Sequence, residues 1–261
     1  MKSVPRFPFE NLRLVEAYGS HQTVSLKTSN RRTYGVPPGG PFDRESAALA
    51  NALAGQPEEA PLLEIALGPV TVEALEETTL VVVGGPDGAF PLGKGERFKI
   101  LPTNARAYLA IGRGQERHLA NPPCTGDAPI RILPGPQADL FDLQAFLGQS
   151  YKVALSSNRV GLRLEGIAMP HTINLPSEPA IPGAIQLPAG GHPIILGPDG
   201  PTIGGYPKVA VVIAADLDRL GRLRPGDEIR FEQVTLEEAC LVRAHASAAS
   251  SLRAAELRAV L

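Results

Sequence analysis

The sequence has few of the residues by which common sites are recognised. Its 261 residues include two cysteines and no tryptophan, and aromatic residues make up 5% of the chain. Cys124 and Cys240 lie far apart and form no Cys-x-x-Cys spacing, which excludes a disulfide framework and a cysteine metal motif. The five histidines are scattered without the spacing of a metal-binding motif. We therefore expect no metal site.

Long apolar runs and a dominant charge are also missing. The formal net charge is -2, and no long basic tract is present, which argues against a dedicated nucleic-acid binder. No window approaches the ~20 apolar residues of a membrane span. The first ten residues lack the apolar core of a signal peptide. The sequence predicts a cytoplasmic protein that binds neither nucleic acid nor membrane.

Glycine and proline are abundant instead, with 27 and 26 residues. Together they make up roughly a fifth of the chain, which is below the range of disordered segments and typical of many turns between short strands. The clearest example is residues 182–207, where Ala184–Leu187 and Pro193–Leu196 are short apolar runs bounded by breakers. The pattern predicts a mainly β fold.

The remaining expected strands follow the same pattern of short apolar runs. They lie at residues 12–18, 23–26, 62–67, 80–83, 97–101, 106–111, 129–133, 151–155, 161–164, 209–214 and 228–234, the first two as a hairpin. The polar stretch 112–129 contains Pro122-Pro123 and indicates a boundary. We expect two domains, at residues 1–125 and 126–261.

A few helices complete the predicted fold. The best lies at residues 43–53, with Asp43 as N-cap and Gly55 at the glycine position after the C-cap. Shorter helical segments are expected at residues 139–147 and 216–220, the second capped by Asp216. Thr235 and Glu238 have the spacing of a capping box, which predicts a C-terminal helix.

Familiar catalytic motifs are missing or incomplete. Residues 88–94 have the glycine and lysine spacing of a phosphate loop, but Gly95 stands where a magnesium-binding Ser or Thr is needed, and Pro91 interrupts the loop. We interpret this stretch as a hairpin turn. The sequence contains no Gly-x-Ser-x-Gly elbow and no Ser-x-x-Lys pair, so a standard nucleophile is not expected.

Candidate functional residues are polar side chains in glycine-rich loops. Asp43 follows Gly39 and Gly40 at a helix start, which suits an anion site but suits a structural N-cap better. Arg159 and Arg163 could bind a carboxylate or phosphate, or pair with surface charges.

A second group of polar side chains lies in and around the glycine-rich loop of residues 197–207. Gln137 and Gln186 could orient a small polar substrate or satisfy buried backbone groups. Polar groups that converge near exposed glycine backbone are a weak ligand-site pattern. The residues around the loop that fit this pattern are Asp199, Thr202, Gly204, Gly205, Tyr206 and Lys208.

Several ordered segments resemble the allophanate hydrolase subunit 2 family, which includes the carboxyltransferase domain of urea carboxylase, the antagonist of a sporulation kinase inhibitor, and the C subunit of bacterial 5-oxoprolinase. They cover most of the chain. The resembling segments are residues 35–43, 50–55, 63–65, 131–137, 158–164, 182–186, 204–207 and 223–227.

The resemblance implies two cyclophilin-like β-barrel domains with a cleft between them. It also implies ATP-dependent opening of the 5-oxoproline lactam to glutamate, with a subunit 1-like protein and a lactam-utilisation subunit as partners. ATP is then bound by this chain or by its partners, and neither a metal nor biotin is bound by this chain. Activation of an amide by phosphorylation needs groups that stabilise an oxyanion and phosphate. We expect catalytic roles for Arg159, Gln186, Asp199 and Tyr206, and ligand binding by Gly39, Gly40, Asp43, Gln137, Arg163, Thr202, Gly204, Gly205 and Lys208.

Two departures from the family pattern leave alternatives open. Pro201 and Ile203 stand where the family usually has polar residues, and the segment 112–127 is shorter than usual. One alternative is a non-catalytic member that binds and regulates a subunit 1-like partner. The other is a carboxyltransferase component of a urea carboxylase or allophanate hydrolase-like system, which depends on a separate biotinylated protein.

Overall fold

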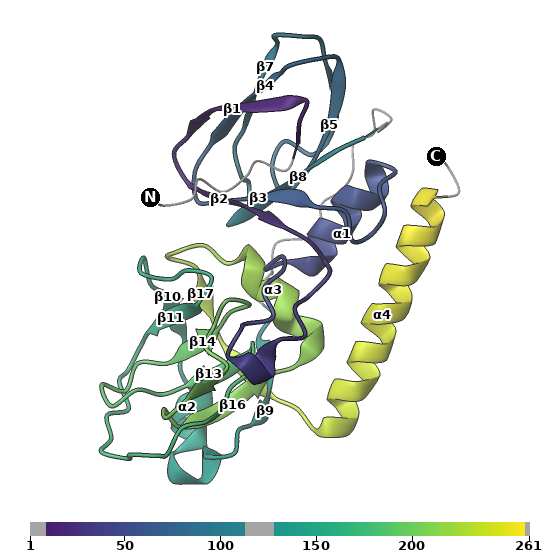
Figure 1. The fold of residues 1–261 in the computed structure, drawn as a ribbon. Helices are drawn as coiled ribbons and strands as arrows, with labels where there is room; N and C mark the ends of the chain where they lie inside the picture. The colour runs from purple at the N-terminus through teal and green to yellow at the C-terminus, as the bar shows by residue number, and fades with distance from the viewer. Residues whose placement is uncertain (1–8, 113–127, 259–261) are drawn as a thin grey trace. The chain divides into compact units, whose positions relative to one another are not determined.

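The computed structural model describes residues 9–112 and 128–258, with side chains as far as residue 249 (Figure 1). Contacts group these residues into two units. The first comprises residues 9–27, 43–112 and 248–258, and the second comprises 28–42 and 128–247. The expected boundary between residues 125 and 126 lies outside the described residues. The structure also groups residues 28–42 with the second unit, although the residues before and after them in the chain belong to the first unit.

The first unit contains two antiparallel sheets. The smaller has the strand order β1-β4-β7, and the larger β2-β3-β8-β5-β6. The strands are β1 (Leu12–Ala17), β2 (Ser20–Val24), β3 (Leu62–Ala66), β4 (Val70–Ala74), β5 (Thr78–Val83), β6 (Gly88–Leu92), β7 (Arg97–Ile100) and β8 (Arg106–Ile111).

Both faces of the larger sheet are buried, which explains why its central strands are continuous apolar runs. Leu80 and Val82 of β5 face one core cluster, which includes residues of β1 and β4. Val81 and Val83 face a second cluster formed with helix α1 (Arg44–Leu53). The predicted strands 62–67, 80–83, 97–101 and 106–111 are confirmed, whereas β4 was missed.

The predicted hairpin of residues 12–18 and 23–26 is wrong. β1 pairs with β4, and β2 pairs with β3, so the two strands belong to different sheets. The chain changes sheet at Gly19, where it passes so close to residues 66–68 that a Cβ atom would lie 2.2 Å from the Ala66 carbonyl oxygen. A glycine is required at this crossing because any side chain would clash with backbone.

The interpretation of residues 88–94 as a hairpin turn is also wrong. Gly88–Leu92 forms β6, at the edge of its sheet, where Pro91 lies opposite Thr79. Proline is tolerated there because an edge strand has one side without ladder hydrogen bonds. An extended edge strand does not form a phosphate loop.

Helix α1 begins and ends as the sequence predicts. The Asp43 side chain accepts a hydrogen bond from the backbone N–H of Ser46, and Gly55 follows the C-cap with φ of 66°. Leu49 is buried against the sheet, and Leu53 packs at the margin of the same cluster. The helix therefore covers one face of the larger sheet.

The second unit is built on an eight-stranded sheet with the order β17-β10-β11-β14-β13-β16-β9-β18. Its two edge strands follow each other in the chain, since Arg230 alone separates β17 from β18. The sheet is thus a nearly closed barrel, and the mainly β prediction is confirmed. The strands are β9 (Ile130–Pro134), β10 (Tyr151–Val153), β11 (Gly161–Glu165), β13 (Ala184–Gln186), β14 (Ile194–Leu196), β16 (Lys208–Val212), β17 (Glu228–Ile229) and β18 (Phe231–Gln233).

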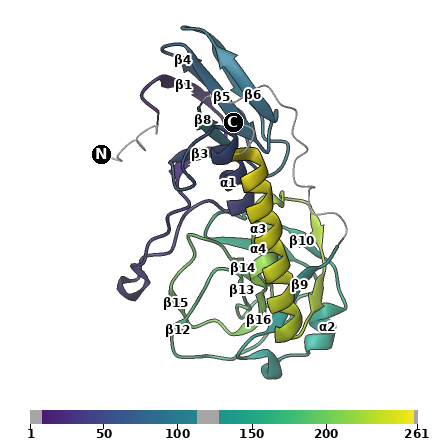
Figure 2. The ribbon, with the colours of Figure 1, turned by 90° about the vertical axis from the view of Figure 1, so that its right-hand side faces the viewer.

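The barrel core and its outer face are distinguished by strand alternation. Leu162, Ile185 and Ile195 belong to the core cluster, which also includes Phe42 from the segment 28–42. β12 (Glu178–Pro179) and β15 (Ile203–Gly204), which are separated in the chain by β13 and β14, form a two-stranded antiparallel sheet; both strands are labelled in Figure 2. Ala180 beside this small sheet packs on outward-facing residues of β13 and β14. The small sheet β12–β15 therefore covers part of the outer face of the barrel sheet.

The helices of the second unit are α2 (Leu143–Leu147) and α3 (Leu217–Arg222), with 3₁₀ turns at Arg32–Tyr34, Ala138–Leu140 and Ala214–Asp216. The long helix α4 (Leu236–Arg258) begins in the second unit, and its residues from 248 onward are grouped with the first. The capping box at the start of α4 is confirmed by hydrogen bonds in both directions between Thr235 and Glu238. Asp216 precedes α3 but makes no capping hydrogen bond; it is buried and forms ion pairs with Arg131 and Arg219. Within the described part of the chain, no helix is long and apolar enough to cross a membrane.

Candidate functional site

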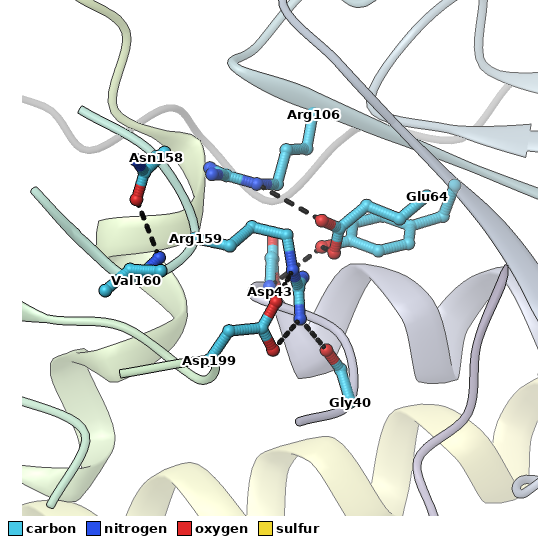
Figure 3. A network of polar contacts seen from close by, with 9 residues as sticks. Gly40, Asp43, Glu64, Arg106, Asn158, Arg159, Val160 and Asp199 are labelled. Atoms are coloured by element: carbon cyan, nitrogen blue, oxygen red, sulfur yellow. Dashed lines mark hydrogen bonds and ion pairs between the residues drawn. The ribbon is translucent and has the colours of Figure 1, made fainter. Parts of the chain in front are cut away.

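Arg159 joins two glycine-rich loops of the second unit. Its Nε and Nη2 atoms donate to the two carboxylate oxygens of Asp199 over 2.7 and 2.9 Å, and Nη2 also donates to the Gly40 carbonyl over 2.7 Å (Figure 3). The Arg159 side chain is 12% exposed and that of Asp199 37%. A planar guanidinium suits this two-pronged contact because its N–H groups match a carboxylate. The arrangement holds the loops in register.

Backbone contacts reinforce this connection. The Gly39 N–H donates to the Pro198 carbonyl, and the Asp199 N–H donates to the Arg159 carbonyl. Asn158 stabilises the turn before β11 by accepting hydrogen bonds from the N–H groups of Val160 and Gly161. The contact between Arg159 and Asp199 thus belongs to a well-connected loop assembly, and the guanidinium acts chiefly through the loops that it positions.

A second polar cluster lies where the small sheet β12–β15 meets the outer face of the barrel sheet. The Lys208 Nζ atom and the Gln137 Nε2 atom both donate to Oε2 of Glu178, over 2.8 and 3.1 Å. The Gln137 side-chain oxygen accepts from the Lys208 backbone N–H over 2.9 Å. The hydrogen bonds from Lys208 and then Gln137 hold the pKa of the Glu178 carboxyl below its usual value.

Gln186 lies beside this cluster with an unmatched donor. It is opposite Lys208 in the register of β13 and β16, and it is 4% exposed. Its Nε2 atom is buried and has no hydrogen-bond partner. A Cβ atom on Gly204 would lie 3.0 Å from that nitrogen, so the glycine allows β15 to approach the amide closely. A buried unmatched donor is costly, and such groups are uncommon in folded proteins.

The other candidates of the second unit are placed less centrally. Thr202 is buried, and its carbonyl accepts a hydrogen bond from the Ala180 N–H. Gly205 and the half-exposed Tyr206 continue the same loop. The Arg163 side chain is exposed on the outer face of β11, in line with Gln186 through their shared partner Ile194. The structure therefore brings together Gln137, Gln186, Gly204 and Lys208, and separately Gly39, Gly40, Arg159 and Asp199.

Asp43 belongs to the first unit and has a structural role. Its carboxylate accepts from the backbone N–H and the hydroxyl of Ser46 over 3.0 and 2.6 Å, which confirms the N-cap interpretation. Its own N–H donates to the Tyr108 hydroxyl over 2.8 Å, and that hydroxyl donates to Glu64 over 2.9 Å. Glu64 also forms an ion pair with Arg106 (Figure 3).

This network lies almost wholly out of solvent. Tyr108 has no exposed surface, and Glu64 is 1% exposed. Burial, followed by the negative charge of Glu64, raises the pKa of the Tyr108 phenol well above its usual value. The phenol therefore remains protonated at neutral pH and can donate to the carboxylate.

Sequence reasoning missed Glu178, Glu64, Arg106 and Tyr108. Glu178 lies in a two-residue strand after an irregular proline-containing stretch, where no local pattern marks it. Glu64 and Tyr108 occur within apolar runs, and a charged residue in such a run was the available signal for Glu64. Among the described residues, no group of three or more His, Cys, Asp or Glu side chains is arranged to hold a metal ion.

Comparison with known protein families gives a match over most of the chain. The family model described as carboxyltransferase domain, subdomain A and B, matches residues 34–99 and 83–233. The chain belongs to this carboxyltransferase domain family. The membership confirms the resemblance identified from the sequence segments. The matched residues include the loops that carry Arg159 and Asp199 and the whole cluster around Glu178.

Three relatives show how far this similarity extends. The chain is 30% identical to the C subunit of 5-oxoprolinase from Escherichia coli, over 81% of this chain and 87% of that protein. It is 26% identical to a urea amidolyase of Lachancea kluyveri over 78% of this chain, but spans 16% of that protein. The crystal structure of TTHA0988 matches with a TM-score of 0.75 and 30% identity, over 88% of this chain and 57% of that one.

Proposed function

We propose that this chain is a subunit of an ATP-dependent 5-oxoprolinase, which opens the lactam of 5-oxoproline to glutamate. Its similarity to the C subunit of a 5-oxoprolinase across 87% of the relative's length carries the proposal. The proposed partners are a subunit 1-like protein and a lactam-utilisation subunit, and ATP is bound by this chain or by those partners.

The polar groups of the second unit suit part of this chemistry. The substrate carries a carboxylate and an amide carbonyl, and both accept hydrogen bonds. Lys208, Gln137 and Gln186 supply donors from buried positions, where an electrostatic contact is stronger than in water. Arg159 is paired with Asp199 and Gly40, so we give it a positioning role for the glycine loops. Asp199 shares that role, and Tyr206 remains a candidate for substrate contact.

Reconstitution tests the proposal. The chain is produced with the subunit 1-like and lactam-utilisation proteins encoded in the same genome, and glutamate and phosphate are measured after addition of 5-oxoproline and ATP. We expect both products only when all proteins and ATP are present. Lys208→Met should reduce turnover strongly, whereas the matched control Lys152→Met, on the exposed side of β10, should not. No glutamate from the assembled wild-type complex would refute the proposal.

The similarity to a urea amidolyase supports carboxyl transfer as the second candidate function. In that case the chain would take a carboxyl group from a biotinylated protein and pass it to an acceptor. Addition of avidin to the reconstituted system distinguishes the two, because it blocks a reaction that depends on biotin and leaves lactam opening unchanged. Binding to a subunit 1-like protein without either reaction would favour the regulatory alternative.

A further inference from the structure

Glu178 occupies an arrangement of donors that resembles a binding site for an anion. Lys208 and Gln137 are 6% and 9% exposed, and both donate to the same carboxylate oxygen, Oε2. The Glu178 side chain itself is 35% exposed. Lys208 lies on β16 and Gln137 directly precedes the 3₁₀ turn Ala138–Leu140; both donors are buried, whereas the acceptor lies at the surface on β12.

A third donor is available beside these two. Gln186 lies opposite Lys208 in strand register, and its buried Nε2 atom has no partner. That atom lies next to Gly204, and Gly204 is paired with Glu178 in the small sheet β12–β15. Two side-chain donors thus share one oxygen of the Glu178 carboxylate, and a third donor lies beside the residue that is paired with Glu178. The unmatched Gln186 donor would gain a hydrogen bond if a ligand carboxylate with an oxygen within its reach replaced the Glu178 carboxylate.

We infer that Lys208, Gln137 and Gln186 form a binding site for a small carboxylate, and that Glu178 occupies it until the ligand displaces it. A buried ammonium group must keep an anionic partner, so exchange of one carboxylate for another costs less than removal of the partner. The small sheet that carries Glu178 has two strands of two residues each, which limits the backbone hydrogen bonds that hold it in place.

The identity of the ligand rests on the proposed function, because 5-oxoproline carries the required carboxylate. Any small carboxylate would satisfy the same donors, so acetate serves as a probe that is independent of lactam chemistry. The lactam 2-pyrrolidinone has the ring amide without the carboxylate and separates the two parts of the substrate.

The test is a titration of the full chain with each of the three probes, in which binding is measured by NMR and by calorimetry. We expect 5-oxoproline and acetate to bind and 2-pyrrolidinone not to bind. Glu178→Gln should tighten carboxylate binding roughly tenfold, since it removes a competing charge-assisted hydrogen bond but keeps the side-chain size. Glu73→Gln is the matched control, because Glu73 also forms ion pairs, with Arg13 and Arg97, but lies in the first unit. The Glu73→Gln variant should bind carboxylates with the affinity of the wild type.

Two variants test the donors. Lys208→Met should abolish carboxylate binding, and circular dichroism establishes whether this variant is folded. Gln186→Met keeps the Lys208–Glu178 ion pair and should weaken carboxylate binding several-fold through loss of one hydrogen bond. Unchanged affinity in Glu178→Gln, or in Gln186→Met, would overturn the inference. If Glu178→Gln binds acetate more tightly but the reconstituted wild-type complex forms no glutamate, this site is retained and the proposed function is refuted. If the wild-type complex forms glutamate but Glu178→Gln binds acetate no more tightly, the proposed function is retained and this site is refuted.

Discussion

The contact between Arg159, Asp199 and Gly40 provides a sharp test of how the glycine loops are held. Arg159→Lys keeps the positive charge but replaces a planar fork with a single ammonium group. Of the three hydrogen bonds in the native contact, we expect lysine to retain one at most. Each lost bond is worth about 1–1.5 kcal/mol, since Asp199 is more than one-third exposed and solvent screens the pair. The free energy of unfolding should therefore fall by about 2–3 kcal/mol.

Thermal unfolding followed by circular dichroism measures this loss. For a unit of this size, 1 kcal/mol corresponds to about 2–4 °C, so we expect the melting temperature to fall by roughly 4–12 °C. Arg163→Lys is the matched control, because Arg163 is exposed on the following strand; its free energy of unfolding should stay within about 0.5 kcal/mol of the wild type. Proteolysis within residues 28–42 should accelerate only in the Arg159 variant. Equal melting temperatures for the two variants would show that the bidentate contact does not stabilise the loops.

Three further predictions concern buried polar groups and the small sheet β12–β15. Tyr108→Phe removes a hydroxyl with two buried hydrogen-bond partners and should lower the free energy of unfolding, measured by urea titration, by about 2–4 kcal/mol. Tyr151→Phe is the control, because it loses one hydrogen bond and should cost about 1 kcal/mol. Equal losses in the two variants would contradict this prediction. Gly204→Ala should reduce affinity for carboxylates and lower the melting temperature, since the added Cβ lies 3.0 Å from a buried amide nitrogen; unchanged binding would refute this crowding. The lowered pKa of Glu178 means that its contribution to stability is present at neutral pH and is lost as the pH falls from the ordinary glutamate range through the lower folded-state pKa. An NMR titration should find this midpoint below that of an ordinary glutamate and raised in Lys208→Met, and an unchanged midpoint would exclude the ion pair in solution.

Local signals in the sequence were sufficient for much of the fold. The limits of α1 follow from Asp43 and Gly55, whose capping roles depend on neighbouring residues alone. The capping box of Thr235 was recognisable for the same reason. Short apolar runs between glycines and prolines located most of the strands of both units.

Pairing between distant segments was not accessible in this way. The strands β1 and β2 are near neighbours in sequence, yet each pairs with a strand far along the chain, because Gly19 redirects the backbone between sheets. β6 contains Pro91, which argues against a strand unless its edge position is known. Strand existence was therefore predictable and strand partnership was not.

The candidate site shows the same division. Gln137, Gln186 and Lys208 were recognised as polar residues in unusual surroundings, and the structure places them together. Glu178, which joins two of them, could not be found, because its position depends on the pairing of β12 with the distant strand β15 and on how this small sheet lies on the barrel sheet. Asp43 was correctly weighed as an N-cap, since that role needs only its local sequence.

The grouping of residues 28–42 with the second unit affects how this protein can be divided and how it is made. A fragment that starts at residue 126 would lack Phe42 of the barrel core, and Arg159 would lose its Gly40 acceptor. During synthesis, residues 28–42 emerge from the ribosome before their partners at Ala180 and residues 197–200, so this part of the barrel must wait for the rest of the chain. A peptide spanning residues 28–42, added in trans, should stabilise the isolated fragment 126–261, because it supplies Phe42 to the core and the Gly40 carbonyl to Arg159.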